Sequence, residues 1–115
     1  MGRRNVTTRT EIPPGTLYML ILRTLARLGP MHGYGIAQFI QQTSDDVLQV
    51  EEGSLYPALQ RMLVKGWVSS EWGQSENNRR ARFYRMTPAG KKQLSVEITE
   101  FDMVMRAIQR VIQPA

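Results

Sequence analysis

Cysteine is absent from this chain of 115 residues. Thiolate nucleophiles, disulfide frameworks and cysteine-based zinc sites are therefore excluded. Long apolar runs are absent too, since no segment reaches the roughly 18 to 20 apolar residues that cross a bilayer. The basic residues near the N-terminus are not followed by an apolar run of signal-peptide length. These absences predict a soluble, cytoplasmic protein without a membrane partner.

Groups that perform catalysis are scarce as well. His32 is the only histidine, and its place at the start of a predicted helix favours a capping or packing role over that of a metal ligand or general base. The acidic pairs Asp45-Asp46 and Glu51-Glu52 have no histidines or further carboxylates at metal-ligand spacing. Glycine-rich phosphate loops, nucleophile elbows and internal repeats are absent. The sequence therefore predicts neither an enzyme nor a protein that holds a cofactor or metal.

Positive charge is what the chain has in excess. The formal net charge is +5, which favours a polyanionic partner such as nucleic acid. Between residues 73 and 92 there is one acidic residue, Glu76, among six basic ones: Arg79, Arg80, Arg82, Arg85, Lys91 and Lys92. A charge run is usually a solvated face. Here it falls on a predicted hairpin, where a basic tip can lie along a phosphate backbone or enter the minor groove.

The order of predicted elements is that of a winged helix-turn-helix. Periodicity and end signals predict helices over residues 17–28, 31–42, 54–65 and 88–113. They also predict two strands, over 67–72 and 82–87, and a brief strand near 49–51. The fold class is mainly α, with a two-stranded β-wing and a long C-terminal dimerisation helix. We expect a basic arm over residues 1–13, the DNA-binding domain over 14–87 and the dimerisation helix over 88–115.

The third predicted helix is the candidate DNA-reading helix. Its apolar stripe is Leu55, Leu59, Met62 and Leu63, and its ends are marked by Ser54 as a cap and Gly66 as a left-handed stop. Such helices also occur in proteins that never touch DNA. With the basic hairpin beside it, we expect Ser54, Tyr56 and Lys65 to hold phosphates, and Gln60 and Arg61 to read base edges. The predicted DNA-binding set is Ser54, Tyr56, Pro57, Gln60, Arg61, Lys65, Arg79, Arg80 and Arg82.

The last predicted helix has the apolar rhythm of a coiled-coil seam. Its seam residues are spaced alternately four and three apart, and the helix would be roughly 39 Å long, more than so small a domain can cover. The alternative is one helix lying back on its own domain. The first helix has a second apolar stripe that a partner subunit or the last helix would cover. The predicted dimerisation set is Tyr18, Leu22, Leu94, Ile98, Phe101, Met105, Ile108 and Ile112.

Two methionines of the last helix allow a second interpretation of its apolar surface. Met103 and Met105, with Phe101, could line an apolar pocket for a small molecule between subunits, because methionine adapts to varied shapes. Plain packing between two subunits is the alternative, and we favour it.

Three segments resemble the PadR family of bacterial transcriptional regulators. They are His-Gly-Tyr-Gly-Ile at 32–36, Gly-Ser-Leu-Tyr-Pro-Ala-Leu at 53–59 with Arg61, Gly66 and Trp72, and Arg-Phe-Tyr-Arg-Met-Thr-Pro-Ala-Gly at 82–90. A single helix after residue 90 resembles the short branch of that family, whose members dimerise through this helix and the first one. The resemblance implies a repressor that binds a pseudo-palindromic operator near a promoter. In some members a phenolic or drug-like effector releases the DNA.

The predicted function is therefore a homodimeric, sequence-specific DNA-binding transcriptional regulator, in which a small apolar or phenolic effector relieves repression. Its partners are double-stranded DNA, a second copy and that effector. Two alternatives remain at this level. One is a winged-helix protein-interaction module without sequence-specific DNA binding, and the other is an effector-binding carrier with no DNA role.

Overall fold

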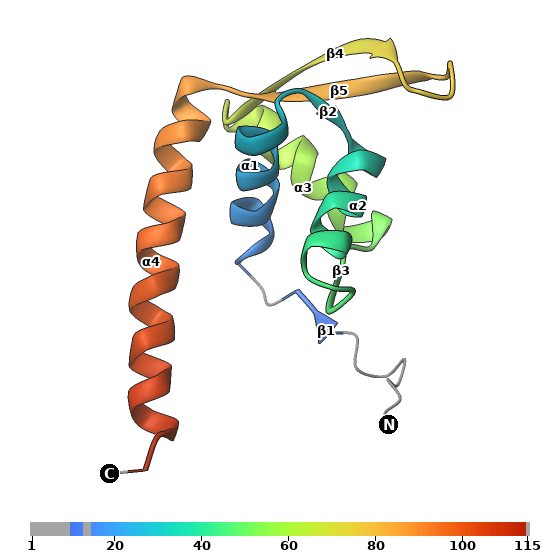
Figure 1. Ribbon diagram of the computed structural model, residues 1–115. Helices are drawn as coiled ribbons and strands as arrows, with labels where there is room; N and C mark the ends of the chain where they lie inside the picture. The colour runs from blue at the N-terminus through green and yellow to red at the C-terminus, as the bar shows by residue number, and fades with distance from the viewer. Residues whose placement is uncertain (1–9, 13–14, 115) are drawn as a thin grey trace, which may run out of the picture.

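The computed structural model describes residues 10–12 and 15–114 (Figure 1). The helices of this part are α1 (Leu17–Leu28), α2 (Gly33–Thr43), α3 (Glu52–Val64) and α4 (Pro88–Ile112). The strands are β1 (Thr10–Glu11), β2 (Met31–His32), β3 (Leu48–Gln49), β4 (Val68–Gln74) and β5 (Arg80–Met86). Most of the predicted basic arm, including Arg3, Arg4 and Arg9, lies outside the described residues. The expected winged helix-turn-helix order, mainly helical with a small sheet, is confirmed.

Residue-level signals at the helix ends account for most of the boundaries. Thr87 lies before α4, and its hydroxyl accepts the backbone N–H of Gly90 at 3.0 Å. His32 caps α2 in the same way, because its Nδ1 accepts the N–H of Gly35 at 3.0 Å. At the end of α3, Gly66 has a φ of +77° and the N–H of Trp67 reaches back to the carbonyl of Met62 at 3.0 Å. These are the stops and caps that the sequence predicted.

The start of α3 differs from the prediction. The helix begins at Glu52, with Glu51 as its N-cap residue, so the predicted capping role of Ser54 is wrong. The carbonyl of Glu51 accepts the N–H groups of Ser54 and Leu55 at 3.0 and 2.9 Å, and Glu52 places a negative charge at the positive end of the helix dipole. Pro57 consequently lies inside the helix rather than in its first turn. It cannot donate to the carbonyl of Gly53, which lies on the exposed face.

The sheet contains a strand that the sequence did not reveal. The three-stranded sheet has the order β2-β5-β4, and both of its pairings are antiparallel. Met31 and His32 were predicted to begin the second helix, but they pair with Tyr84 and Phe83 of β5. A two-residue strand has no periodicity to detect, and its partner is some fifty residues away in the chain. A second, two-stranded sheet pairs β1 with β3 in parallel.

The hydrophobic core lies between α1, α2, α3 and the base of the β4–β5 hairpin. Leu22 is fully buried within this chain, so its assignment to a subunit interface is wrong. Leu94 of α4, at 6% exposed, also belongs to the core of the chain. Both stripes of α1 are thus covered largely from inside the molecule. The largest side chains with less than 2% exposure are Ile21, Leu22, Ile36, Leu55, Leu59, Met62 and Thr24.

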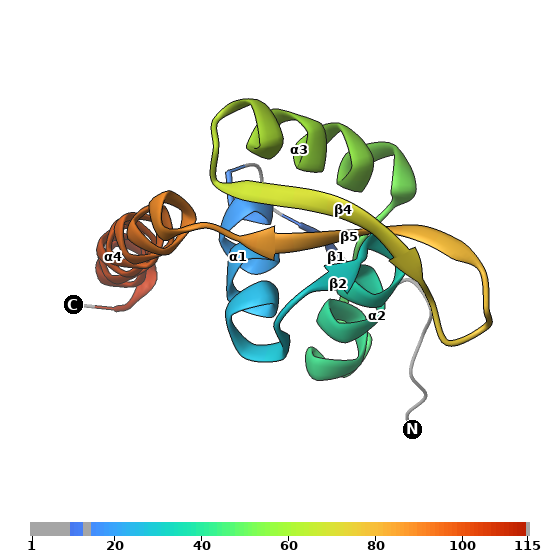
Figure 2. The same cartoon turned by 90° about the horizontal axis from the view of Figure 1, so that it is seen from above.

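The last helix stands apart from the rest of the fold. Its first half packs against α1, and its second half extends beyond the end of that helix (Figures 1 and 2). The radius of gyration is 15.9 Å, whereas a compact domain of this length has about 13 Å. Among the described residues, no helix combines the length and apolar character that a membrane crossing requires.

Candidate nucleic-acid interface

The outward face of α3 is built from small side chains. Gly53, Pro57, Gln60 and Val64 recur every three or four residues and are all exposed, and Val64 is 88% exposed. This face is opposite the one that buries Leu55 and its neighbours in the core. A helix face without bulky side chains allows its backbone to approach the floor of a groove. Gln60 is its polar side chain, with an amide that can donate and accept hydrogen bonds.

The hairpin of β4 and β5 presents a stacked aromatic and cationic surface. Trp72 pairs with Arg82 across the ladder, and Gln74 pairs with Arg80, so these side chains share one face. The guanidinium carbons of Arg80 and Arg82 lie 4.7 and 5.8 Å from the centre of the Trp72 indole. The indole itself is 58% exposed. We call this hairpin, residues 68–86, the wing.

A cleft of about 770 Å³ lies between the wing, α2 and Tyr56 of α3. Its cations are Arg79, Arg80 and Arg82, against the single acid Glu76. In the described part of the chain no carboxylate is within salt-bridge distance of these three arginines, whereas Arg85 lies 3.8 Å from Glu71. The three guanidinium groups are therefore available to an anion that enters the cleft. The polar and aromatic lining includes Tyr34, Gln38, Gln42 and Tyr56.

Tyr56 occupies the inner wall of this cleft. Its ring lies directly over Gly33, at a distance that leaves no room for a β-carbon there. Burial raises the pKa of the Tyr56 phenol, and the nearby Glu52 carboxylate and Tyr84 add to the increase. The phenol therefore stays protonated at neutral and mildly alkaline pH. A protonated hydroxyl at the edge of a cationic cleft is a hydrogen-bond donor for an anionic oxygen.

Two predicted contacts lie elsewhere than on the outward face. Arg61 lies on the flank of α3 that faces α1, where its Nε donates to the hydroxyl of Tyr18 at 2.6 Å. The ammonium group of Lys65 lies 5.2 Å from the ring centre of Trp67. Ser54 and Pro57 are exposed on α3. Thus the structure brings Tyr56 together with the three wing arginines, and separates Arg61 from Gln60.

Two exposed positions were missing from the predicted set. Tyr34, in the first turn of α2, is 66% exposed, and its ring stacks on His32 at 6.5 Å between centroids. An aromatic residue two positions after a helix cap was a usable signal for Tyr34. For Val64 the signal was helical periodicity, which places it off the apolar stripe of the reading helix.

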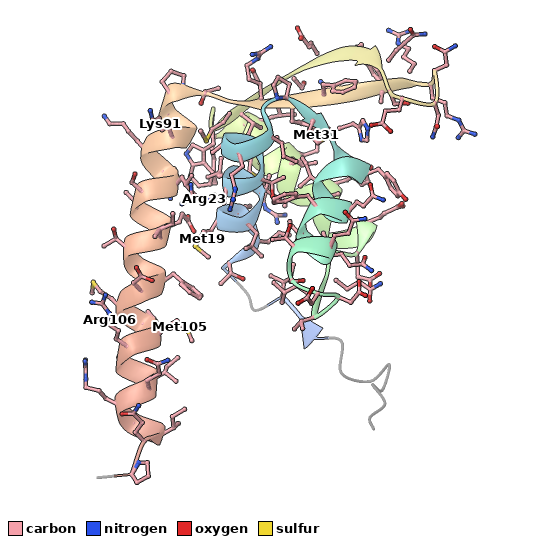
Figure 3. The ribbon with its side chains drawn as sticks, in the orientation of Figure 1. Met19, Arg23, Met31, Lys91, Met105 and Arg106 are labelled. Atoms are coloured by element: carbon pink, nitrogen blue, oxygen red, sulfur yellow. The ribbon has the colours of Figure 1, made fainter. Side chains whose placement is uncertain are left out.

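The second half of α4 exposes apolar side chains on the predicted seam. Phe101 and Met105 are each 37% exposed, Ile108 is 45% exposed and Ile112 is 72% exposed. Ile98 packs against the core, so the seam continues the face by which α4 contacts α1. Figure 3 shows Met105 directed to the side on which the domain lies and Arg106 directed away from it. Each seam residue beyond Ile98 therefore keeps at least a third of its surface exposed, and this exposure is greatest at Ile112.

Groups that could hold a metal ion do not occur in the described part of the chain, where histidine and acidic side chains nowhere gather in threes. The arrangement instead offers free cations, a neutral phenol and a shallow helix face. These are the groups that contact phosphates and base edges.

Comparison with known proteins supports this description. The transcriptional regulator PadR-like family matches residues 21–96. An uncharacterized protein X of Lysinibacillus sphaericus is 30% identical over 100 residues, which cover 87% of this chain and 91% of the relative. A transcriptional regulator from Clostridium thermocellum has a similar structure, with a TM-score of 0.78 and 27% identity, over 86% of this chain and 95% of that one.

A PadR family transcription regulator from Clostridium difficile is also similar, with a TM-score of 0.72 and 26% identity, over 85% of this chain and 99% of that one. The family match covers well over half of the chain, including α2, α3 and the wing. The chain therefore belongs to the PadR-like family of transcriptional regulators, DNA-binding proteins that are not enzymes.

Proposed function

We propose that this regulator is a homodimeric repressor that binds a pseudo-palindromic operator with α3 in the major groove and the wing on the flanking backbone. The observation that supports it most is the position of Tyr56, which lines the cationic cleft and directly precedes Pro57 of the outward face of α3. One duplex can therefore meet both surfaces. In a winged helix-turn-helix the reading helix enters the groove while cationic groups beside it hold phosphates.

The cleft supplies the backbone contacts in this proposal. Arg79, Arg80 and Arg82 neutralise phosphates, and the Tyr56 hydroxyl donates to a phosphate oxygen from the inner wall. Ser54 and Lys65 hold phosphates at the two ends of α3. Gln60 contacts base edges from the outward face, where an amide can make two hydrogen bonds to adenine. Pro57 and Val64 provide apolar surface for thymine methyl groups.

A second copy is the natural cover for the exposed seam. Phe101, Met105, Ile108 and Ile112 form a continuous apolar row on a helix of 25 residues, most of whose second half is exposed. Rows of this spacing pair with another helix by knobs-into-holes packing. Two subunits joined along α4 would present two copies of α3 about one turn of DNA apart, roughly 34 Å. The arm over residues 1–13 would add basic contacts to the backbone.

Repression follows from occupancy of a promoter by the dimer. An effector would act by binding one arrangement of the two subunits better than the other, because equal affinity for both shifts nothing. Phe101 and Met105 are apolar groups of the seam near the junction of the subunits and would contact an apolar or phenolic molecule, whereas Met103 lies about 200° from Phe101, on the far side of α4.

The proposal is tested by measuring binding of the purified protein to its own operator, found by genomic footprinting, and to random DNA at several salt concentrations. Arg80→Ala should weaken binding to both DNAs and lower the salt slope by about 0.9, the value for one phosphate contact. Arg85→Ala removes the same charge from the opposite face of the wing, beside Glu71, and should leave the slope unchanged. Equal effects of the two substitutions, or no salt-dependent DNA binding at all, would contradict the proposal.

A further inference from the structure

Three aromatic and cationic side chains meet where α1, α3 and the start of β4 come together. The guanidinium of Arg61 donates from Nε to the Tyr18 hydroxyl at 2.6 Å, and its carbon lies 5.7 Å from the centre of the Tyr18 ring. That ring meets the Trp67 indole edge-on, with centroids 5.4 Å apart and planes at 78°. We call Tyr18, Arg61 and Trp67 the α1–α3 joint.

Arg61 lies beside the outward face of α3, on the flank of the helix that faces α1. Successive residues of a helix are about 100° apart, so Arg61 is separated from Gln60 by that angle and points to the side on which α1 lies. Its hydrogen bond spans 43 positions of sequence and connects two helices. Arg61 is exposed, but a guanidinium that donates to the Tyr18 hydroxyl and lies close to the same ring has fewer orientations open to it than a fully solvated one.

The start of α4 is attached to the same place. Thr87 donates its backbone N–H to the carbonyl of Trp67 at 3.0 Å and its hydroxyl to the carbonyl of Gly66 at 2.6 Å. A β-carbon on Gly90 would overlap the Trp67 carbonyl oxygen, so the first turn of α4 lies directly against this backbone. The end of α3 is therefore connected to both α1 and α4.

We infer that Arg61 is a positioning residue for operator binding, which fixes the reading helix α3 to α1 through the Tyr18 hydroxyl. This inference rests on the proposed function, in which two subunits are joined along α4, whose first half packs against α1. Because the joint fixes α3 within each subunit, the distance between the two reading helices is then set by how the two subunits pack together. An operator with fixed half-site spacing needs that separation, whereas random DNA, held mainly through phosphates, tolerates a change in it.

Operator and random-sequence affinities of Arg61→Ala, Tyr18→Phe and the double variant test the inference. Arg61→Ala should lower operator affinity about tenfold, and Tyr18→Phe, which removes one oxygen and keeps the ring, should lower it by a similar factor. The double variant should lose no more than Arg61→Ala alone, because both changes break one contact. Affinity for random DNA, the salt slope, the melting temperature and the sedimentation coefficient should stay as in the wild type.

Gln60→Ala provides the matched control, because Gln60 adjoins Arg61 but faces outward. The double variant Gln60→Ala/Tyr18→Phe should lose operator affinity by the product of the two single-variant factors, because the two side chains act independently. The inference is overturned if Tyr18→Phe binds the operator as the wild type does, if the two changes at the joint multiply, or if Arg61→Ala lowers the salt slope by about 0.9 as a phosphate ligand would. A wild type that shows no preference for its operator contradicts the proposed function itself. If the wild type does prefer its operator but the variants give any of the three contradicting results, the inference about Arg61 is wrong and the proposed function still stands.

Discussion

Trp72 shows how one residue prepares the wing for its ligand. An indole that is 58% exposed has little packing of its own, yet both Arg80 and Arg82 lie over it. Stacking holds the two guanidinium planes and reduces the side-chain freedom that phosphate binding would otherwise remove. The indole thus orders two cations before DNA arrives, although it need not touch the DNA.

Trp72→Ala should therefore weaken binding to DNA of any sequence by about threefold, because each arginine loses an exposed cation–π contact. The salt slope should stay the same, since both positive charges remain. Fluorescence anisotropy with a labelled duplex at three salt concentrations measures both quantities. Trp72→Phe keeps an aromatic face and should retain most of the affinity, and a change of slope in either variant would show that Trp72 does more than order its neighbours.

The Tyr56 phenol gives a prediction about pH. Tyr56→Phe should weaken binding to any DNA about fivefold, because it removes a hydrogen bond to a charged phosphate. Burial, Glu52 and Tyr84 raise the pKa of the phenol above its ordinary value of 10.0, so the group remains a donor throughout the range from pH 7 to pH 9. The ratio of wild-type to variant affinity should therefore be equal at both pH values. A ratio that falls at pH 9 would mean that the phenol ionises early.

At the scale of single elements, short local signals decide where helices begin and end. Thr87 and Gly66 mark the start of α4 and the end of α3 as the sequence predicted, whereas His32 caps a helix that begins two residues later than predicted. Gly90 acts differently, since it lies within α4 and serves a contact rather than a turn. Its missing side chain lets the first turn of the helix lie against the backbone at Trp67.

Two glycines in helices should respond to alanine in opposite ways. Gly90→Ala should lower the free energy of unfolding by about 1 to 3 kcal/mol, because the new methyl group meets backbone that cannot move aside. Gly53→Ala, with nothing within 4 Å of its β-carbon position, should raise it by about 0.5 to 1 kcal/mol through helix propensity. Urea unfolding followed by circular dichroism measures both. An increase for Gly90→Ala would show that α4 does not approach Trp67 so closely.

For the whole molecule, the length of α4 is the dominant feature. The principal extents of the molecule are 53, 37 and 22 Å. The second half of α4 extends beyond the rest of the fold (Figure 1). The apolar row from Phe101 to Ile112 stays partly exposed within the described chain, from 37% at Phe101 to 72% at Ile112. Leaving such a row in water is unfavourable, and pairing with a second copy removes it.

Phe101→Asp should raise the dissociation constant of the dimer at least about a hundredfold, because a carboxylate would be buried without a partner in the paired state. Sedimentation velocity over a concentration series measures the change. Thr99→Asp adds the same charge two residues earlier, on the far side of the helix, and should leave the dimer intact. A Phe101→Asp protein that sediments as the wild type does would remove this seam from the proposed interface.

The sequence alone was sufficient for the fold class, the order of the helices and the helix ends to within two residues, since each depends on periodicity or on a few adjacent residues. α1 has the predicted bounds, and α4 ends one residue earlier than predicted. The candidate site was predicted in part. The sequence predicted the wing cations from their charge run and Tyr56 from its place on the reading helix. The structure places these residues in one cleft.

The tertiary structure decided what depends on residues far apart in the chain. The pairing of Met31 with Tyr84, the burial of Leu22 and the contact of Arg61 with Tyr18 each join segments that no local pattern connects. Amphipathic spacing predicts which face of its helix a side chain lies on. Which of these faces are buried depends on the helices and strands that pack beside them. Local backbone preferences therefore set the elements of this protein, and long-range packing set the direction in which its functional side chains point.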